Sequence, residues 1–439
     1  MSFYEYTVLP IRYNSQCITF PEWVSLFTLC LAPLIAHIAS GAPQVSYLSN
    51  SRPKWYDHLC HYNPTSIIWR YAVIADRRIR ATRWSRDDLT ASNAIFWTAK
   101  GWDGREDMVF EAAPYKLRCP GLTHVQIMSV AMLKTIIVTM QGVSALYSLV
   151  ALPTGATTLN FQWNMGVDMI FLPLSILGLL RLCAATWLTE DFMYASHDDK
   201  MGEVVPQRSP TIITINNSNT RFTNSHRALD PFPITPLQAR ARFKSPSSWS
   251  SRTFRGTYLL IIGGVWAISL MDFMPGVYLS FTFLTTTSFL AGLFYFIFLT
   301  VSIILYTFYF VRDQTTTTII PCISKKWYKI YTLLIMGFAL VLIVVASIET
   351  NKDPYGSYVN SPPVMQVKCG YLSEKWVFGS PYSAFFGLAS RVESIQNWIG
   401  QNYLSLPVER VSNKSLEERY WIYNFTGYCV GGVENIREL

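Results

Sequence analysis

Long apolar runs alternate with polar segments along this chain. Between Gly256 and Val311 the only ionisable residue is Asp272, and Met274-Pro275-Gly276 divides the run in two. A helix in a soluble core rarely stays apolar beyond ~14 residues, whereas a bilayer span needs about 20. Because lipid forces backbone amides into helices or closed barrels, this run predicts a membrane hairpin.

The same pattern predicts an all-α polytopic membrane protein with six transmembrane helices. The predicted spans are 23–42, 124–152, 166–188, 256–273, 277–311 and 330–349. Ser40-Gly41-Ala42 looks like a cleavage site, but the preceding region is too long and too uncharged for a signal peptide. The span 277–311 would be about 52 Å long as a straight helix at ~1.5 Å per residue, so we expect it to tilt or to bend near Thr285.

The polar segment 43–123 contains helices of its own. Asn63-Pro64 places a cap and then a first-turn proline before an apolar stripe, which predicts a helix. Ser85 and Asp88 form a capping box, which predicts a second helix ending near Gly101. We therefore expect an Arg-rich helical segment between the first two spans.

The other polar segments differ from it in composition. Residues 1–22 are short and nearly uncharged, and 189–255 is rich in Ser, Thr, Asn and Pro, which predicts a largely disordered linker. The last segment, 350–439, is polar and aromatic. Its Cys369 and Cys429 are the most plausible disulfide pair in the chain, which predicts a small disulfide-tied domain.

Composition and charge fit a membrane protein. Hydrophobic residues make up 50% of the chain and charged residues 15%, which is poor in charge for a soluble protein. The formal net charge of +8 would suit a nucleic-acid partner. The basic residues, however, lie between the apolar runs, where a topology signal belongs, so we expect no nucleic-acid partner.

Charge also predicts which way the chain faces. The segments 43–123, 189–255 and 312–329 hold 25 of the 36 Lys and Arg residues, and the positive-inside rule places them in the cytosol. The tail carries acceptor sequons at Asn413 and Asn424, which agree with glycosylation and an oxidised tail outside. We expect the plasma membrane or the secretory pathway, with both termini extracellular or luminal.

Two cations are predicted inside the spans. Lys134 and Arg181 have no acidic residue predicted at matching depth, so they favour binding of an anionic ligand, either a small solute or a lipid head group. The alternative is that both snorkel to the inner interface. The hydroxyls of Thr285, Thr286 and Ser288 either line a polar path or bond to their own backbone and bend the helix.

Other candidates lie in the cytosolic segments. The arginines from Arg70 to Arg86 either rest on anionic inner-leaflet lipids, at about 1 kcal/mol each, or pack against the protein's own surface. Proline follows Ser209, Thr235 and Ser245, which predicts phosphorylation in the linker. The spacing of His58, Cys60 and His61, with Cys119 farther along, matches no zinc site, so we expect no metal and no cofactor.

Three short stretches carry a resemblance. Leu29–His37, Cys60–Ser66 and Arg77–Ala81 resemble uncharacterised multi-pass membrane proteins of filamentous fungi. The likeness covers about the first hundred residues. It implies a fungal membrane protein and assigns no functional residue.

Three functions stay open at this point. The first is transport or a channel for a small anionic or polar solute, and the second is a receptor-like or scaffolding protein with an external tail and a regulated linker. An enzyme acting on lipids is weakest, because no G-x-S-x-G, H-E-x-x-H or P-loop motif occurs. Membrane lipids are expected partners, and self-association as a homo-oligomer is left open.

Overall fold

The computed structural model describes residues 7–11, 13, 15, 18–151, 165–196, 242–273, 283–352 and 358–360, together with three short strands. These strands are β10 (Ser390–Arg391), β11 (Leu406–Pro407) and β12 (Tyr420–Ile422), and they pair in the order β10-β12-β11. The described part of the chain is mostly helical.

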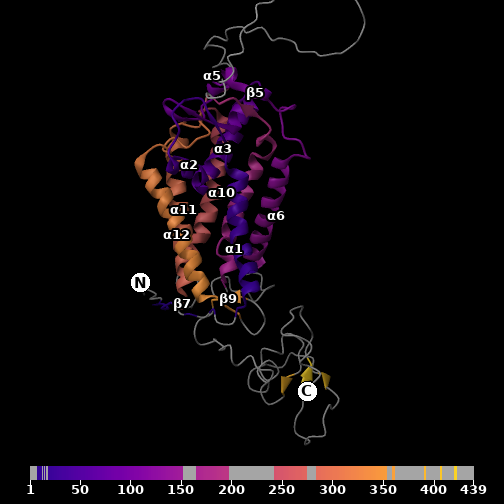
Figure 1. Ribbon diagram of the computed structural model, residues 1–439. Coiled ribbons are helices and arrows are strands. Elements are labelled where there is room, and N and C mark those ends of the chain that lie inside the picture. The colour runs from indigo at the N-terminus through magenta and orange to yellow at the C-terminus, as the bar shows by residue number, and fades with distance from the viewer. Residues whose placement is uncertain are drawn as a thin grey trace, which may run out of the picture.

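Five helices are long and apolar enough to cross a bilayer, and they lie side by side as a bundle (Figure 1). They are α1 (Phe20–Gly41), α6 (Val130–Ala151), α10 (Trp249–Phe273), α11 (Thr286–Val311) and α12 (Lys326–Glu349). The prediction of membrane-spanning helices is confirmed at this level. For 277–311 the structure agrees with a break near Thr285 and not with one continuous tilted helix, because α11 begins at Thr286 and is preceded by β7 (Phe283–Leu284).

The predicted third span is a broken helix. It consists of the 3-10 turns Val167–Met169, Leu179–Cys183 and Ala185–Trp187 and the short helix α7 (Leu172–Gly178). These pieces are separated by breaks, and none of them alone is long enough to cross a bilayer. At one end the Val167 amide donates to Thr350, and at the other the Val125 amide donates to Thr186. Pro173 lies in the first turn of α7, and hydropathy alone does not reveal such breaks.

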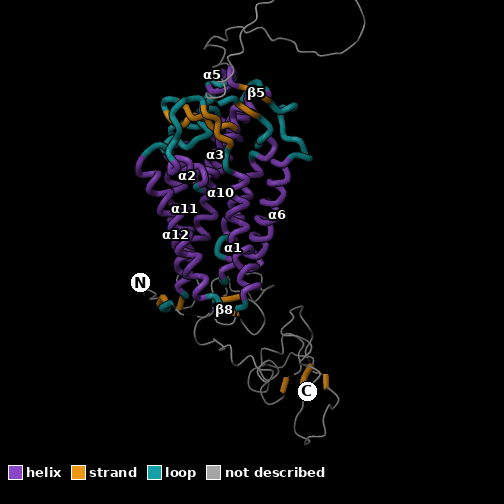
Figure 2. The backbone as a smooth tube through the Cα atoms, in the orientation of Figure 1, coloured by secondary structure: helices purple, strands orange, loops and turns teal. Residues whose placement is uncertain are grey.

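A polar cap lies at one end of the bundle. Its helices are α2 (Trp55–Tyr62), α3 (Pro64–Arg80), α4 (Arg86–Asn93) and α5 (Met108–Glu111). Strand β2 (Gln44–Tyr47) pairs in parallel with β3 (Ala94–Thr98), which pairs antiparallel with β4 (Gly101–Asp103). Strands β5 (Lys116–Arg118) and β6 (Met193–Tyr194) form a second pair (Figure 2).

The caps predicted for α3 and α4 are confirmed. Asn63 accepts from the Thr65 amide at 3.0 Å, and Ser85 and Asp88 form the capping box. The second helix ends at Asn93 and not near Gly101, because the next residues form the buried strand β3. Ile95, Phe96 and Trp97 are β-branched or aromatic, as strands favour.

Helix α3 is the centre of the molecule rather than a surface helix. Almost every residue from Pro64 to Arg77 is buried. The hydroxyls of Tyr258 on α10 and Tyr306 on α11 donate to its carbonyls Ile68 and Thr65. Helix α1 meets it at Gly41, where an added Cβ would collide with the Ile67 side chain, so only glycine allows this approach.

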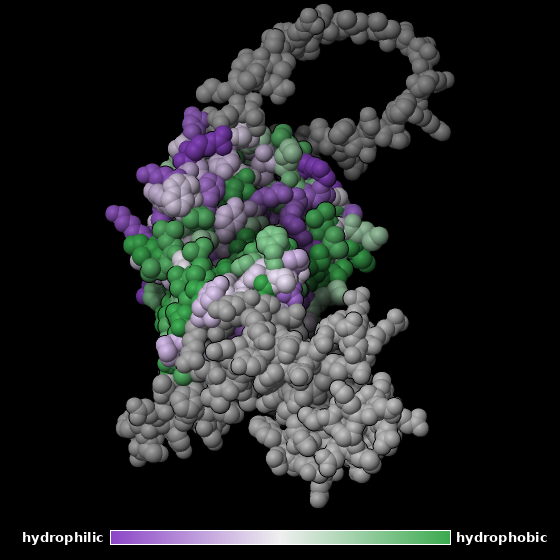
Figure 3. Space-filling view, turned by 60° about the horizontal axis from the view of Figure 1, so that its bottom comes forward, coloured by the Kyte–Doolittle hydropathy of each residue, from purple (hydrophilic) through white to green (hydrophobic). Residues whose placement is uncertain are grey.

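The opposite end of the bundle is built from short pairs of strands. Strand β1 (Thr7–Val8) pairs in parallel with β7, and β8 (Asn351–Lys352) pairs with β9 (Tyr358–Val359). Between the two ends, apolar side chains cover the sides of the helices, whereas hydrophilic ones gather at the polar cap (Figure 3). Large residues such as Met140 and Leu260 are exposed on these sides, as expected for a lipid-facing surface.

Candidate functional site

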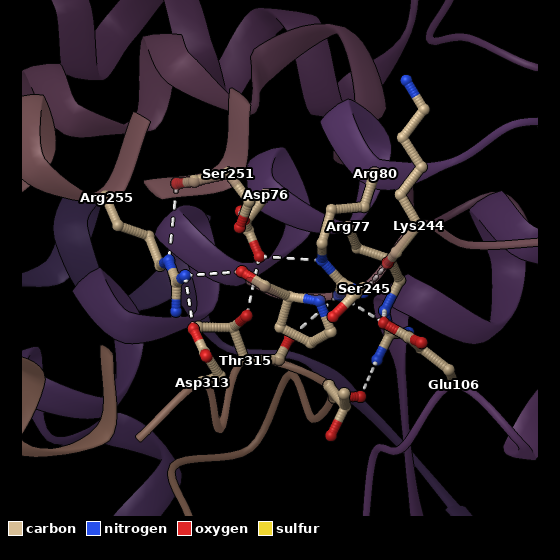
Figure 4. Close-up of polar contacts among 12 residues, drawn as sticks. Asp76, Arg77, Arg80, Glu106, Lys244, Ser245, Ser251, Arg255, Asp313 and Thr315 are labelled. Carbon is tan, nitrogen blue, oxygen red and sulfur yellow. Dashed lines mark hydrogen bonds and ion pairs between the residues drawn. The ribbon is translucent and has the colours of Figure 1, made fainter. Parts of the chain in front are cut away.

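A cluster of buried and half-buried ion pairs lies in the polar cap, and we call it the charge network: Asp76, Arg77, Arg80, Glu106, Arg255 and Asp313. Its first pair lies within one turn of α3, where Arg80 Nε donates to Asp76 at 3.0 Å. Thr315 donates to the same carboxylate at 2.7 Å, and Ser251 donates to its other oxygen (Figure 4). Asp76 thus joins α3 to α10 and to the segment after α11.

Arg77 and Arg80 extend the network toward the loops. Arg77 donates to the carbonyls of Gly104 and Thr316, both at 2.8 Å, while Arg80 also pairs with Glu106. Burial lowers the pKa of Arg77 to about 10, although the nearby Glu106 opposes the shift. The Arg77 guanidinium is therefore still charged at neutral pH, and protein groups rather than solvent surround that charge.

Arg255 forms the second half of the network. It donates to the Phe310 carbonyl and to Asp313, both at 2.7 Å. Asp313 follows the end of α11 with a φ of +55°, and the amides of Asp313 and Gln314 donate back to Phe310 and Tyr309. This is a Schellman motif with Asp in the left-handed position. The ion pair with Arg255 therefore fixes the last turn of α11.

The end of the predicted linker is part of this site. The Thr82 amide donates to Arg242, and the Lys244 amide donates to Arg80, both at 2.8 Å. Phe243 forms an isolated bridge with Ala81, and the Arg242 side chain pairs with buried Asp88. The expectation of disorder is therefore wrong for residues 189–196, which include β6, and for residues 242–255, whereas 197–241 lie outside the described residues.

This arrangement joins α3, the start of α10 and the segment after α11 through hydrogen bonds and ion pairs. The Asp76 carboxylate accepts from Arg80, Ser251 and Thr315, whereas the Asp313 carboxylate accepts from Arg255 and lies 3.8 Å from Arg252. Neither carboxylate lines any of the three hollows described for this structure. Within the described ranges no group of three His, Cys, Asp or Glu residues could hold a metal ion. Breaking one partner of such a buried pair costs about 3–5 kcal/mol, so the network fixes how its segments are joined.

The two cations predicted inside the spans have partners. Lys134 Nζ lies 2.7 and 2.9 Å from the two carboxylate oxygens of Glu190. Arg181 is buried and donates to Thr135 at 2.8 Å, to the Ala131 carbonyl at 3.2 Å and to the Ser40 carbonyl. The expectation that both lack partners is therefore wrong, because the acid comes from the segment that follows the third span and the carbonyls come from the ends of helices.

The hydroxyl-rich stretch is a helix cap. Thr285 is the N-cap of α11 and accepts from the Ser288 amide, and Thr286 donates to the Leu9 carbonyl at 2.7 Å. Glu349, at the end of α12, accepts from the Thr287 amide at 2.7 Å. These groups join the ends of three segments, and the described residues show no polar path leading from them.

The arginines predicted to lie on lipid differ in burial, and Arg78 is half-buried, with its guanidinium over the rings of Trp84 and Trp187. Arg70, Arg77 and Arg80 are buried, and Arg70 donates to the Gly41 and Asn93 carbonyls at 2.8 Å. Arg83 and Arg86 are exposed. The periodicity placed the arginines on a polar face, but their partners come from segments up to 239 residues away, which no local pattern reveals.

The remaining predicted residues fall in several places. His58 and His61 pack edge-on against Trp102, and Cys119 donates to Asp87. Ser245 is exposed at the start of the turn before α10. The other predicted modification residues lie outside the described part of the chain: Ser209, Thr235, Cys369, Asn413, Asn424 and Cys429.

A groove and a cavity lie between the long helices. A groove of about 750 Å³ runs between α1 and α6 and includes Lys134. A cavity of about 120 Å³ lies between α7, α10 and α11, and its lining is almost entirely apolar, with Tyr295 and Ser288 at its edge. The Tyr295 hydroxyl donates to Ile170, so it is already used by the protein.

The comparisons with known proteins add no relative. No protein-family model, no curated protein and no solved structure matches this chain. The resemblance to fungal multi-pass proteins therefore stays a prediction, and function is inferred from the chemistry of the described residues.

Proposed function

We propose that the chain is a receptor-like or scaffolding membrane protein whose linker regulates the polar cap. The observation that carries this proposal is the insertion of residues 242–255 into the charge network, where they join α3, α10 and the end of α11. A signal that altered the linker would act directly on buried ion pairs. Because such pairs are costly to break singly, they suit a two-state lock.

The proposal includes six crossings with the polar cap in the cytosol. Five long apolar helices support this proposal, and we assign the sixth crossing to the broken segment 165–188, whose Val167 amide donates to Thr350 and whose Thr186 carbonyl accepts from Val125. Residues 7–8 and 358–359 lie together at the end opposite the cap, as an even number of crossings requires. The cap also gathers the basic segments, in agreement with the positive-inside rule. Arg83 and Arg86 are its arginines free to meet anionic lipid.

Hydrogen exchange of the full chain in lipid nanodiscs tests the regulated lock. Arg242→Ala removes the pair with Asp88, so we expect faster exchange in residues 80–92 and 313–319. The control is Arg118→Gln, which removes the exposed pair with Asp191 and should leave both regions unchanged. Unchanged exchange in Arg242→Ala would contradict the proposal.

Transport is the second candidate, because the groove between α1 and α6 reaches Lys134. Its mostly apolar lining favours an amphipathic solute over a free inorganic anion. Proteoliposome flux separates the two functions. Saturable flux that falls in Lys134→Gln, but not in Lys116→Gln, would replace the receptor-like proposal with transport.

A further inference from the structure

The groove between α1 and α6 is built like a site for one lipid molecule. One face of α1 lines it from Val24 to Ser40, and α6 contributes Lys134, Ile137, Val138 and Gln141. The α1 face is about 24 Å long at ~1.5 Å per residue, which covers most of a ~30 Å hydrocarbon core. A groove of this length suits an extended acyl chain better than a compact solute.

The walls of the groove are apolar and open sideways. Val24, Ile35 and Ile137 are 51%, 59% and 45% exposed, although all three lie on helices long enough to span a bilayer. Exposed apolar surface of this extent is covered by lipid in a membrane. The side chain of Thr28 donates to the Val24 carbonyl, so it offers no free donor to a polar ligand.

Charge is confined to one end of the groove. Lys134 is the only charged residue in its lining, and its ion-pair partner Glu190 lies next to it, just outside the lining. Both side chains are about one-third exposed, at 29% and 32%, so a head group can reach them. Arg181 lies behind this wall, but its guanidinium is taken up by Ser40, Thr135 and Ala131. The rim thus presents one positive and one negative group with no net charge.

We propose that this groove binds a zwitterionic glycerophospholipid of the leaflet next to the polar cap. The phosphate accepts from Lys134 Nζ, the ammonium group donates to the Glu190 carboxylate, and an acyl chain lies along α1. A paired Lys and Glu match such a head group by charge complementarity, whereas an anionic lipid would bring its charge against Glu190. The proposal is independent of the receptor-like function, because the charge network is not part of the groove.

Lipid retention tests the site. The full chain is reconstituted in nanodiscs of equal phosphatidylethanolamine and phosphatidylglycerol, moved into mild detergent, and examined by native mass spectrometry. We expect one retained phosphatidylethanolamine. Lys134→Gln and Glu190→Gln should each lower its retention about tenfold, the effect of losing ~1.4 kcal/mol.

Two more variants separate the groove from the bulk surface. Ile137→Trp fills the groove from an exposed position and should abolish retention, while Lys116→Gln removes a different ion pair in the cap and should not. If circular dichroism shows that Ile137→Trp is misfolded, lipid retention by Glu190→Gln decides whether the proposal holds. Preferential retention of phosphatidylglycerol, equal retention of both lipids, no retained lipid, or retention unaffected by Lys134→Gln and Glu190→Gln would each overturn the proposal.

Discussion

Asp76 is the residue on which the charge network depends, because donors from three separate parts of the chain converge on its carboxylate. Arg80 comes from the same helix, Ser251 from α10 and Thr315 from the segment after α11. The side chains of Asp76 and Arg80 are each 1% exposed, so water cannot replace a lost partner. Such a site tolerates the loss of both partners better than the loss of one.

Asp76→Asn should therefore lower the free energy of unfolding by about 3–5 kcal/mol. Denaturant unfolding in detergent micelles measures this loss. The matched control is Asp103→Asn, whose partner Arg105 is 47% exposed, and it should cost under ~1 kcal/mol. In the double variant Asp76→Asn, Arg80→Met the cost should be smaller than the sum of the single variants; additive costs would show that the pair is not coupled.

His61 gives the cap a pH-dependent stability. Burial, with smaller contributions from His58 and Arg70, lowers its pKa from 6.5 to about 3. The unfolded chain takes up a proton below about pH 6.5 that the folded chain refuses, so stability falls as pH drops from 6.5 toward 3. His61→Phe should flatten that decline by up to ~1.4 kcal/mol per pH unit, because Phe takes up no proton in either state. Equal pH slopes in wild type and His61→Phe would refute this.

At the scale of elements, the sequence predicted the long apolar helices well, but it did not determine where helices are broken. The five long helices follow from runs of apolar residues, which need only local information. The broken segment 165–188 and the start of α11 depend on neighbours. Thr350 satisfies the Val167 amide and Glu349 satisfies the Thr287 amide, and both acceptors come from the far end of α12. No window of sequence around either break contains its partner.

The N-cap residue of α11, Thr285, allows the two interpretations of the hydroxyl-rich stretch to be tested. Thr285→Ala removes the side chain that accepts from the Ser288 amide, so we expect a loss of about 1 kcal/mol in unfolding free energy. Thr285→Ser keeps the hydroxyl and should retain most of the wild-type stability. If instead Thr285→Ala leaves stability unchanged but alters solute flux, the hydroxyls line a path, as the alternative interpretation of the sequence held.

At the scale of the whole molecule, the two ends of the bundle differ: basic residues and contacts between distant segments gather at the polar cap. The cap joins segments that are far apart in sequence, including α3, the end of the linker and the segment after α11. Its basic composition was visible in the sequence, but its shared core was not, because the arginine partners are mostly backbone carbonyls of distant loops. Because every residue has a backbone carbonyl, the amino-acid sequence does not show which carbonyls accept from these arginines.

Orientation is the prediction that belongs to this scale. Arg83→Cys lies at the cap and Ile11→Cys at the opposite end, and both positions are exposed. If the basic cap is cytosolic, a membrane-impermeant maleimide should label Ile11→Cys on intact cells and Arg83→Cys only after permeabilisation, each measured above the wild-type background. The reverse pattern would place the cap outside. The Lys134 end of the lipid groove would then face the outer leaflet, while the contacts within the charge network would be unaffected, because they do not depend on which side the cap faces.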